Sequence, residues 1–79
     1  PSIARIHAED GCELFAAHLA PDGTVVLLEK WASVAALAAH QAGEPVRALR
    51  AARAPFEGGP ATVEPLVAVP SGDSARGSL

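Results

Sequence analysis

The chain has 79 residues, of which 49% are hydrophobic and 19% charged, and its formal net charge is −3. This composition is typical of a globular chain with room for one domain. The negative charge gives no electrostatic reason to bind nucleic acid, because that affinity depends on phosphate neutralisation. The apolar stretches at 25–28 and 34–39 are shorter than the roughly 20 residues that cross a bilayer, so we expect no membrane partner.

One cysteine and a short chain limit how the fold is stabilised. A single core in a chain of this size supplies about 3–5 kcal/mol. The lone cysteine cannot form an internal disulfide, and no zinc-type cysteine spacing occurs. Oligomerisation is the remaining way to stabilise so small a fold, so we expect a homodimer. The lone thiol, and a start without the pattern of a signal peptide, predict a cytoplasmic protein.

The first half of the chain predicts the end of a helix followed by a hairpin. Ser2 to Glu9 has the spacing of an amphipathic helix, which Asp10-Gly11 ends. Strands are expected at Cys12 to Ala20 and at Thr24 to Trp31. The Pro21-Asp22-Gly23 segment between them is a turn, because proline presets φ and glycine accepts a positive φ.

Side chains alternate between the two faces of a strand, which predicts which residues lie together. In the first strand one face comprises Cys12, Leu14, Ala16 and His18, and the other Glu13, Phe15, Ala17 and Leu19. In the second strand one face comprises Val25, Leu27, Glu29 and Trp31. Because the second strand is apolar on both faces, both must be covered, one by helices and the other by a second subunit.

Two helices are expected after the hairpin. Ser33 can cap the first, which runs to about Ala42, because its hydroxyl accepts from a first-turn N–H. The inner stripe of this helix is expected to comprise Val34, Leu37 and Gln41, with His40 one turn beyond Leu37. Pro45 suits the first position of the second helix, Val46 to Ala54, which Pro55 ends. Its inner stripe is expected to comprise Val46, Leu49 and Ala52 or Arg53.

The last part of the chain predicts a strand and a tail. A turn at Glu57 to Pro60 precedes a strand from Ala61 to Val69, which Pro65 restricts to a sheet edge or a bulge. The Ser/Gly-rich segment from Pro70 to Leu79 is expected to be a flexible tail. The chain therefore divides into a domain at 1–69 and a tail at 70–79.

Several short motifs occur in an order that resembles the antibiotic biosynthesis monooxygenase family. They are Gly11-Cys12, Phe15 and His18, then Glu29-x-Trp31, then Ala36-Leu37 and His40, and finally the VEPLV run. The resemblance covers most of residues 3–69. It implies an α+β, ferredoxin-like antiparallel sheet with helices on one face. Two such sheets pair into a dimeric α/β barrel.

The chain departs from the family pattern at its start. Members begin with a strand and a full helix, whereas this sequence begins where that helix would be ending. That strand is central in a ferredoxin-like sheet, so its absence would leave backbone groups unpaired. We therefore expect the first strand and most of the first helix to be missing from this chain.

The resemblance implies a cofactor-independent monooxygenase that acts on a quinol, an anthrone or a similar aromatic molecule with O2. The residues expected to shape the substrate pocket are Phe15, Leu27, Glu29 and Trp31. His40 is the first candidate for proton transfer, because an imidazole titrates near neutral pH. Arg50 is the candidate for holding an oxyanion. No flavin, P-loop or dinucleotide motif occurs, so we expect no cofactor.

Structural roles compete with each of these assignments. Trp31 can be a core aromatic with its indole N–H satisfied, and His40 can be a helix C-terminal histidine favoured by the dipole. Glu29 is expected to pair with an arginine. The arginines at 47, 50 and 53 can form a solvated face, and Cys12 a small buried apolar residue.

Metal and haem sites are not expected. No two residues among His7, His18, His40 and Cys12 have the close spacing of metal ligands. Haem-degrading relatives of the fold carry a Trp where this chain has His40 and a His where it has Arg50.

The second functional hypothesis is a dimeric barrel that binds a small apolar ligand without turnover, or that serves as a structural module. A closed apolar cavity with convergent polar groups would favour the enzyme. A filled core with Trp31 packed flat would favour the binding module.

Overall fold

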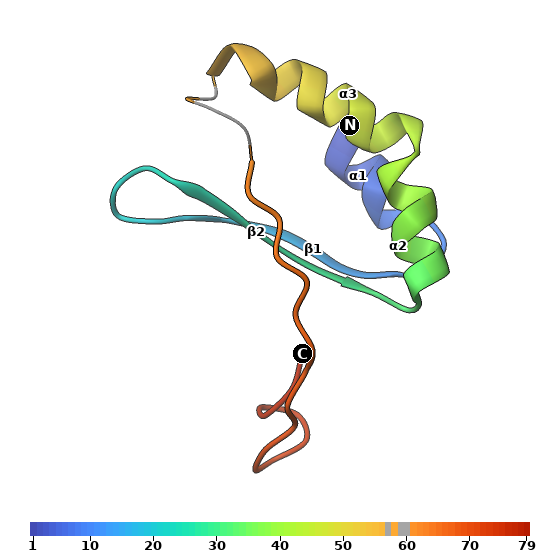
Figure 1. Ribbon diagram of the computed structural model, residues 1–79, viewed down its shortest axis with the longest axis vertical. Helices are drawn as coiled ribbons and strands as arrows, with labels where there is room; N and C mark the ends of the chain where they lie inside the picture. Colours follow the sequence, from blue (N-terminus) through green and yellow to red (C-terminus); the bar gives the residue numbers. More distant parts are fainter. Residues whose placement is uncertain (57, 59–60) are drawn as a thin grey trace.

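Three helices lie over one end of a two-stranded hairpin in the computed structural model, which describes residues 1–56, 58 and 61–79 (Figure 1). The helices are α1 (Ser2–His7), α2 (Val34–Gln41) and α3 (Glu44–Arg53), and a 3₁₀ helix, η1 (Ala54–Phe56), follows α3. The strands β1 (Cys12–Leu19) and β2 (Val25–Trp31) pair antiparallel. The α+β class predicted from the sequence is confirmed.

The turn between β1 and β2 has the predicted chemistry. Gly23 adopts a φ of 89°, in the region that glycine occupies without steric cost. Its N–H donates to the Ala20 carbonyl at 2.9 Å. The N–H of Thr24 donates to Asp22 Oδ1 at 2.9 Å, and this backbone hydrogen bond lowers the pKa of Asp22. The turn is therefore closed by its own polar groups.

A bulge near the start of β1 corrects the predicted faces of that strand. Cys12 pairs with Trp31, but the next pair joins Leu14 to Lys30, so the register shifts between them. An extra residue in one strand moves the following side chains to the opposite face. Phe15, which pairs with Glu29, therefore shares a face with Cys12, whereas strict alternation placed them on opposite faces.

The first long helix, α2, is capped as predicted but is rotated differently about its axis. The N–H of Ala36 donates to Ser33 Oγ at 3.0 Å, which confirms the N-cap. Val34 is 86% exposed, and the inward face consists of Ala36, Leu37 and His40. The predicted stripe through Val34 and Gln41 is wrong. Because α2 is rich in alanine, close packing contacts rather than hydrophobic periodicity determine which of its faces points inward.

Helix α3 begins earlier than predicted. Gly43 is its N-cap and Glu44 its first residue, so Pro45 occupies the second position rather than the first. Val46 is buried and Leu49 half-buried, as expected. The sequence left Ala52 or Arg53 open for the next inward position. Arg53 is half-buried whereas Ala52 is exposed, so Arg53 completes the stripe.

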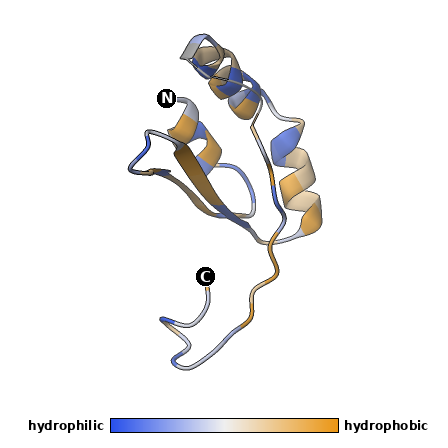
Figure 2. Cartoon of the chain, turned by 60° about the vertical axis from the view of Figure 1, so that its left-hand side comes forward, coloured by the Kyte–Doolittle hydropathy of each residue, from blue (hydrophilic) through white to orange (hydrophobic). Residues whose placement is uncertain are grey.

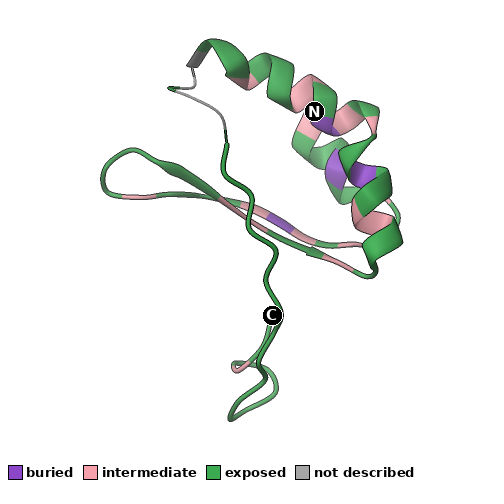
Figure 3. Ribbon diagram, viewed as in Figure 1, coloured by how far each residue is buried: buried purple, intermediate pink, exposed green. Residues whose placement is uncertain are grey.

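The core is small and lies where the helices meet the hairpin (Figure 3). Among the described residues, the buried apolar side chains are Ile6, Phe15 and Val46. The remaining buried side chain in that set belongs to His40, which is 2% exposed. A histidine therefore occupies a central place in a core that has few residues.

The segment at 61–70 is extended but is not a strand, which corrects the strand predicted from Ala61 to Val69. In the described part of the chain the sheet contains β1 and β2 alone, so this segment pairs with neither edge of the hairpin. Its apolar side chains remain exposed, with Val67 at 90%. Figure 2 shows the hydrophobic colour along part of this segment as well as along the hairpin.

The C-terminal part of the chain also carries a predicted turn and a predicted tail. The turn predicted at Glu57 to Pro60 lies outside the described residues, apart from Gly58, which forms a bend. In the final segment, the Ser71 N–H donates to the Gly77 carbonyl at 3.3 Å, closing a short loop. The division into a domain at 1–69 and a flexible tail at 70–79 stays a prediction.

Candidate functional site

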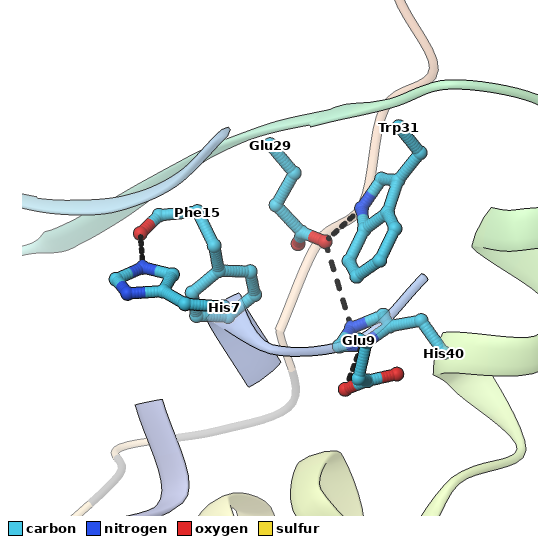
Figure 4. Close-up of polar contacts among 6 residues, drawn as sticks. All are labelled: His7, Glu9, Phe15, Glu29, Trp31 and His40. Carbon is cyan, nitrogen blue, oxygen red and sulfur yellow. Dashed lines mark hydrogen bonds and ion pairs between the residues drawn. The ribbon is translucent and has the colours of Figure 1, made fainter. Parts of the chain in front are cut away.

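The buried histidine of α2 contacts two carboxylates (Figure 4). His40 Nδ1 lies 3.1 Å from Glu9 Oε1, within hydrogen-bond distance. His40 Nε2 lies 3.6 Å from Glu29 Oε1, within the range of an ion pair. The two carboxylates come from the loop after α1 and from β2, so both nitrogens of one ring face acidic side chains from different elements.

Aromatic rings enclose the same imidazole. Trp31 stacks on it, with ring centroids 4.4 Å apart and an interplanar angle of 28°. Phe15 approaches edge-on at 5.7 Å. The indole N–H of Trp31 donates to Glu29 Oε1 at 3.1 Å, which is the oxygen that faces His40. We call this set of five residues, Glu9, Phe15, Glu29, Trp31 and His40, the histidine cluster.

The strand β2 positions two members of the histidine cluster. Glu29 and Trp31 are two residues apart, so their side chains leave the same face of the strand. The hairpin register places Phe15 opposite Glu29. His40 reaches this face from the last turn of α2, where the helix dipole also favours a cation.

A tight loop positions Glu9. The Glu9 N–H donates to the Ile6 carbonyl at 3.0 Å, and the Cys12 N–H donates to the Glu9 carbonyl at 3.2 Å. Gly11 has a φ of 81°, and a Cβ added there would lie 2.6 Å from the Cβ of Ala36. The loop therefore packs directly on α2, which brings Glu9 beside His40.

Cys12 lies close to both carboxylates. Burial raises the pKa of its thiol, and the negative charges of Glu9 and Glu29 raise it further. The side chain is half-buried rather than fully buried. A raised pKa makes the thiolate scarce at neutral pH, so this cysteine is not an activated nucleophile.

An open hollow of about 1640 Å³ extends from the histidine cluster. It is lined by residues of β2, α2 and α3 and of the extended segment at 61–69. Drug-sized ligand pockets usually measure about 300–1,000 Å³, so this hollow is larger and more open than a closed pocket. Leu27 and Arg50 line it, together with Phe15 and Trp31.

The structure brings most of the predicted site residues together but leaves Arg50 apart from them. Phe15, Glu29, Trp31 and His40 lie in mutual contact, and half-buried Leu27 lies on the same face of β2 as Glu29. Arg50 lines the hollow from the exposed side of α3, and within the described residues no contact joins it to His40. Glu29, expected to pair with an arginine, contacts His40 and Trp31 instead.

No sequence pattern marks Glu9 as a site residue. It contacts His40 across a separation of 31 residues, and it lies in a loop where no helical or strand periodicity applies. His7 is exposed as a residue, yet its Nε2 lies 2.9 Å from the Phe15 carbonyl. Since a carbonyl only accepts, that nitrogen donates.

Two other features are absent from the described part of the chain. Within the residues that the structure describes, no group of three or more His, Cys, Asp or Glu side chains could hold a metal ion. In the same residues, no helix has the length and apolar character needed to cross a membrane.

Comparison with known proteins identifies the family. A family model described as antibiotic biosynthesis monooxygenase matches residues 2–52. The matched region includes α1, the hairpin, α2 and most of α3, and therefore the whole histidine cluster. Comparisons with curated proteins and with solved structures found no match. The chain belongs to the antibiotic biosynthesis monooxygenase family.

Proposed function

We propose that this protein is a cofactor-independent monooxygenase that oxidises a quinol, an anthrone or a similar aromatic substrate with O2. The observation that carries the proposal is the histidine cluster, in which a buried imidazole and a carboxylate meet an indole at the edge of an apolar hollow. Membership of the monooxygenase family supports the same reaction class.

The proposed reaction needs little from the protein. A phenol or an activated methylene group that loses a proton becomes electron-rich enough to reduce O2. For an anthrone, the methylene carbon becomes a carbonyl, one oxygen atom enters the product and the other leaves as water. The substrate supplies all the electrons. The protein supplies a proton acceptor, an apolar site and stabilisation of the developing oxyanion.

Each residue has a defined part in this proposal. Phe15, Leu27 and Trp31 form the wall on which a planar substrate rests, and His40 with Glu29 forms the proton-accepting group. Arg50 lines the hollow from α3, where a guanidinium could donate to an oxyanion. No cofactor is part of the proposal.

We also propose that the active form is a homodimer. The surface of the chain measures 6109 Å², whereas a compact monomer of 8.0 kDa exposes about 4,400 Å². The difference exceeds the roughly 800 Å² that each partner buries in a standard interface. A second copy could cover the outer face of the hairpin and help to close the hollow. The lone thiol further supports a cytoplasmic location.

One observation favours the second hypothesis, a module that binds a small apolar ligand or serves only a structural role. Trp31 lies flat on His40 at 28°, as expected for a packed core, and the hollow is open rather than closed. The two functions differ in turnover, which is directly measurable.

Oxygen uptake with a panel of hydroquinones and anthrones tests the proposal. We expect uptake above the uncatalysed rate, reduced about 100-fold or more in His40→Ala and reduced in Trp31→Ala. The control is Arg47→Ala, because Arg47 is exposed on α3 in a surface ion pair with Glu44 and does not line the hollow. Substrate binding without uptake, in a folded dimer, would favour the binding module.

A further inference from the structure

Contacts at both nitrogens and on one face of the His40 imidazole keep a substrate away from the ring. Glu9 occupies Nδ1, Glu29 faces Nε2, and Trp31 covers one ring face. The side chain is only 3% exposed. A substrate therefore cannot reach Nε2 without displacing Glu29, although His40 lines the hollow.

The hydrogen bonds to the ring define where its protons lie. An ionised carboxylate only accepts, so Nδ1 must carry the proton that points at Glu9. A neutral imidazole has no second N–H, and its Nε2 lone pair would then face the Glu29 oxygen, which is repulsive. A proton on Nε2 removes this repulsion, and the ring then forms an ion pair with Glu29 across 3.6 Å, a separation outside hydrogen-bond range.

Glu29 is the member of this pair that solvent and ligands can reach. Its side chain is 32% exposed, about ten times the value for His40. Its contacts with Trp31 and His40 both use Oε1. Figure 4 shows the second oxygen pointing away from these partners. That oxygen can accept a proton from a molecule bound in the hollow while the first remains in place.

We propose that the Glu29 carboxylate, rather than the imidazole, exchanges protons with the substrate, and that Glu9 is a positioning residue that fixes His40 behind it. In the forward step the substrate O–H or C–H bond breaks, its electron pair stays on the substrate, and its proton bonds to the free oxygen of Glu29. His40 balances the charge of the carboxylate from the side of Oε1, as the ion-pair partner of Glu29. This assignment rests on the proposed oxygenase function only for the identity of the substrate.

The surroundings of the pair fit this arrangement. The Trp31 N–H holds Oε1 in place, so the carboxylate is oriented from its own strand. Glu9 is 19% exposed and lies on the far side of the ring from Glu29, which suits positioning rather than contact with substrate.

The first test needs no substrate. Exchange of the His40 ring N–H protons with water can be measured by NMR on the intact, nitrogen-labelled protein. Because Glu29 is the partly exposed carboxylate that faces Nε2 and is proposed to exchange protons, we expect exchange at Nε2 to slow about tenfold or more in Glu29→Gln, and Glu29→Asp to recover part of the rate. Unchanged exchange in Glu29→Gln would overturn the proposal.

The control for this test is Glu44→Gln, which removes a carboxylate on a surface ion pair with Arg47 that is 65% exposed on both sides. Exchange at His40 should be unaffected. The same spectra report the tautomer. In Glu9→Gln, we expect the Nδ1 nitrogen signal of His40 to shift, whereas a Glu9 that merely stabilises the fold would leave the ring signals unchanged.

The second test uses turnover of an accepted anthrone or hydroquinone. We expect Glu29→Gln to lower kcat about 100-fold or more with little change in KM, and Glu9→Gln to lower kcat by a smaller factor. Full activity in Glu29→Gln would contradict the assignment. If the wild type oxidises no substrate, the oxygenase function fails, while the exchange measurement still decides whether Glu29 is the route by which protons reach His40.

Discussion

Cys12 lies outside the histidine cluster, but the pKa of its thiol responds to the charges of that cluster. Its thiol pKa is raised by burial and then by Glu9 and Glu29. A raised thiol pKa means that the reactive thiolate appears only at higher pH. The alkylation rate of this one cysteine is therefore a probe of the electrostatics around His40.

We expect iodoacetamide to alkylate Cys12 more slowly than a free thiol at pH 8, by a factor of several. Glu9→Gln should accelerate the reaction, since it removes one of the two negative charges. Recovery should be partial, because burial is the larger cause. Mass spectrometry over pH 7–9 gives the rates, with urea-unfolded protein as the reference. A folded protein that reacts as fast as this reference would contradict the arrangement of charges.

At the scale of elements, the loop between α1 and β1 determines how α2 packs. Gly11 is close enough to Ala36 that no side chain fits between them. The Gly11 carbonyl also accepts from the Ala32 N–H at 2.8 Å, just before α2 begins. These two contacts place the helix that carries His40 against the loop that carries Glu9.

Gly11→Ala should destabilise the protein more than Gly23→Ala. Both glycines have positive φ, at 81° and 89°, which costs an alanine about 1–2 kcal/mol. Only Gly11 adds a clash, with Ala36 Cβ at 2.6 Å, worth about 1–3 kcal/mol more. Urea denaturation measures the two costs.

A second substitution separates strain from overlap at Gly11. In the double variant Gly11→Ala/Ala36→Gly the overlap is removed, so we expect part of the lost stability to return despite the lower helix propensity of glycine. Equal destabilisation by Gly11→Ala and Gly23→Ala would show that the loop at Gly11 is not in close contact with α2.

The elements could be predicted from the sequence because each carries local chemistry. The Pro21-Asp22-Gly23 turn and the Ser33 cap depend on residues within a few positions of one another, and both formed as predicted. Of the candidate site, Glu29 and Trp31 share a face because they lie two apart in one strand. Such inferences need no knowledge of distant contacts.

The rest of the site depends on tertiary packing. Nothing local marks the bulge that moves Cys12 to the face of Phe15, and the contact of Glu9 with His40 spans 31 residues. In α2 the alanines gave no periodicity to set its rotation, so the predicted stripe was wrong. The 61–70 segment has β-branched residues, but it does not pair with the hairpin, and no local residue pattern shows whether an extended segment finds a partner strand.

At the scale of the whole molecule, the chain is too extended to be a compact monomer. Its radius of gyration is 13.9 Å, against about 11.6 Å for a compact chain of this length. The outer face of the hairpin carries Val26, which lies opposite the face of Leu27 and Glu29. This is the face that a second copy is proposed to cover.

We expect sedimentation to give about twice the mass of 8.0 kDa, and Val26→Glu to shift the protein towards monomer, because a buried charge without a partner is costly. The matched control is Val34→Glu, at an 86% exposed position of α2. A wild-type monomer at micromolar concentration, or a dimer that both variants preserve, would contradict the proposed interface.

The central claim is that the histidine cluster supports oxygen transfer to an aromatic substrate. The most direct measurement is mass spectrometry of the product formed from an anthrone under isotopically labelled dioxygen, with wild type and Glu29→Gln compared. We predict one labelled oxygen atom in the wild-type product and almost no enzymatic product from the variant. Oxygen consumption without label in the product, or equal incorporation by both proteins, would contradict the account.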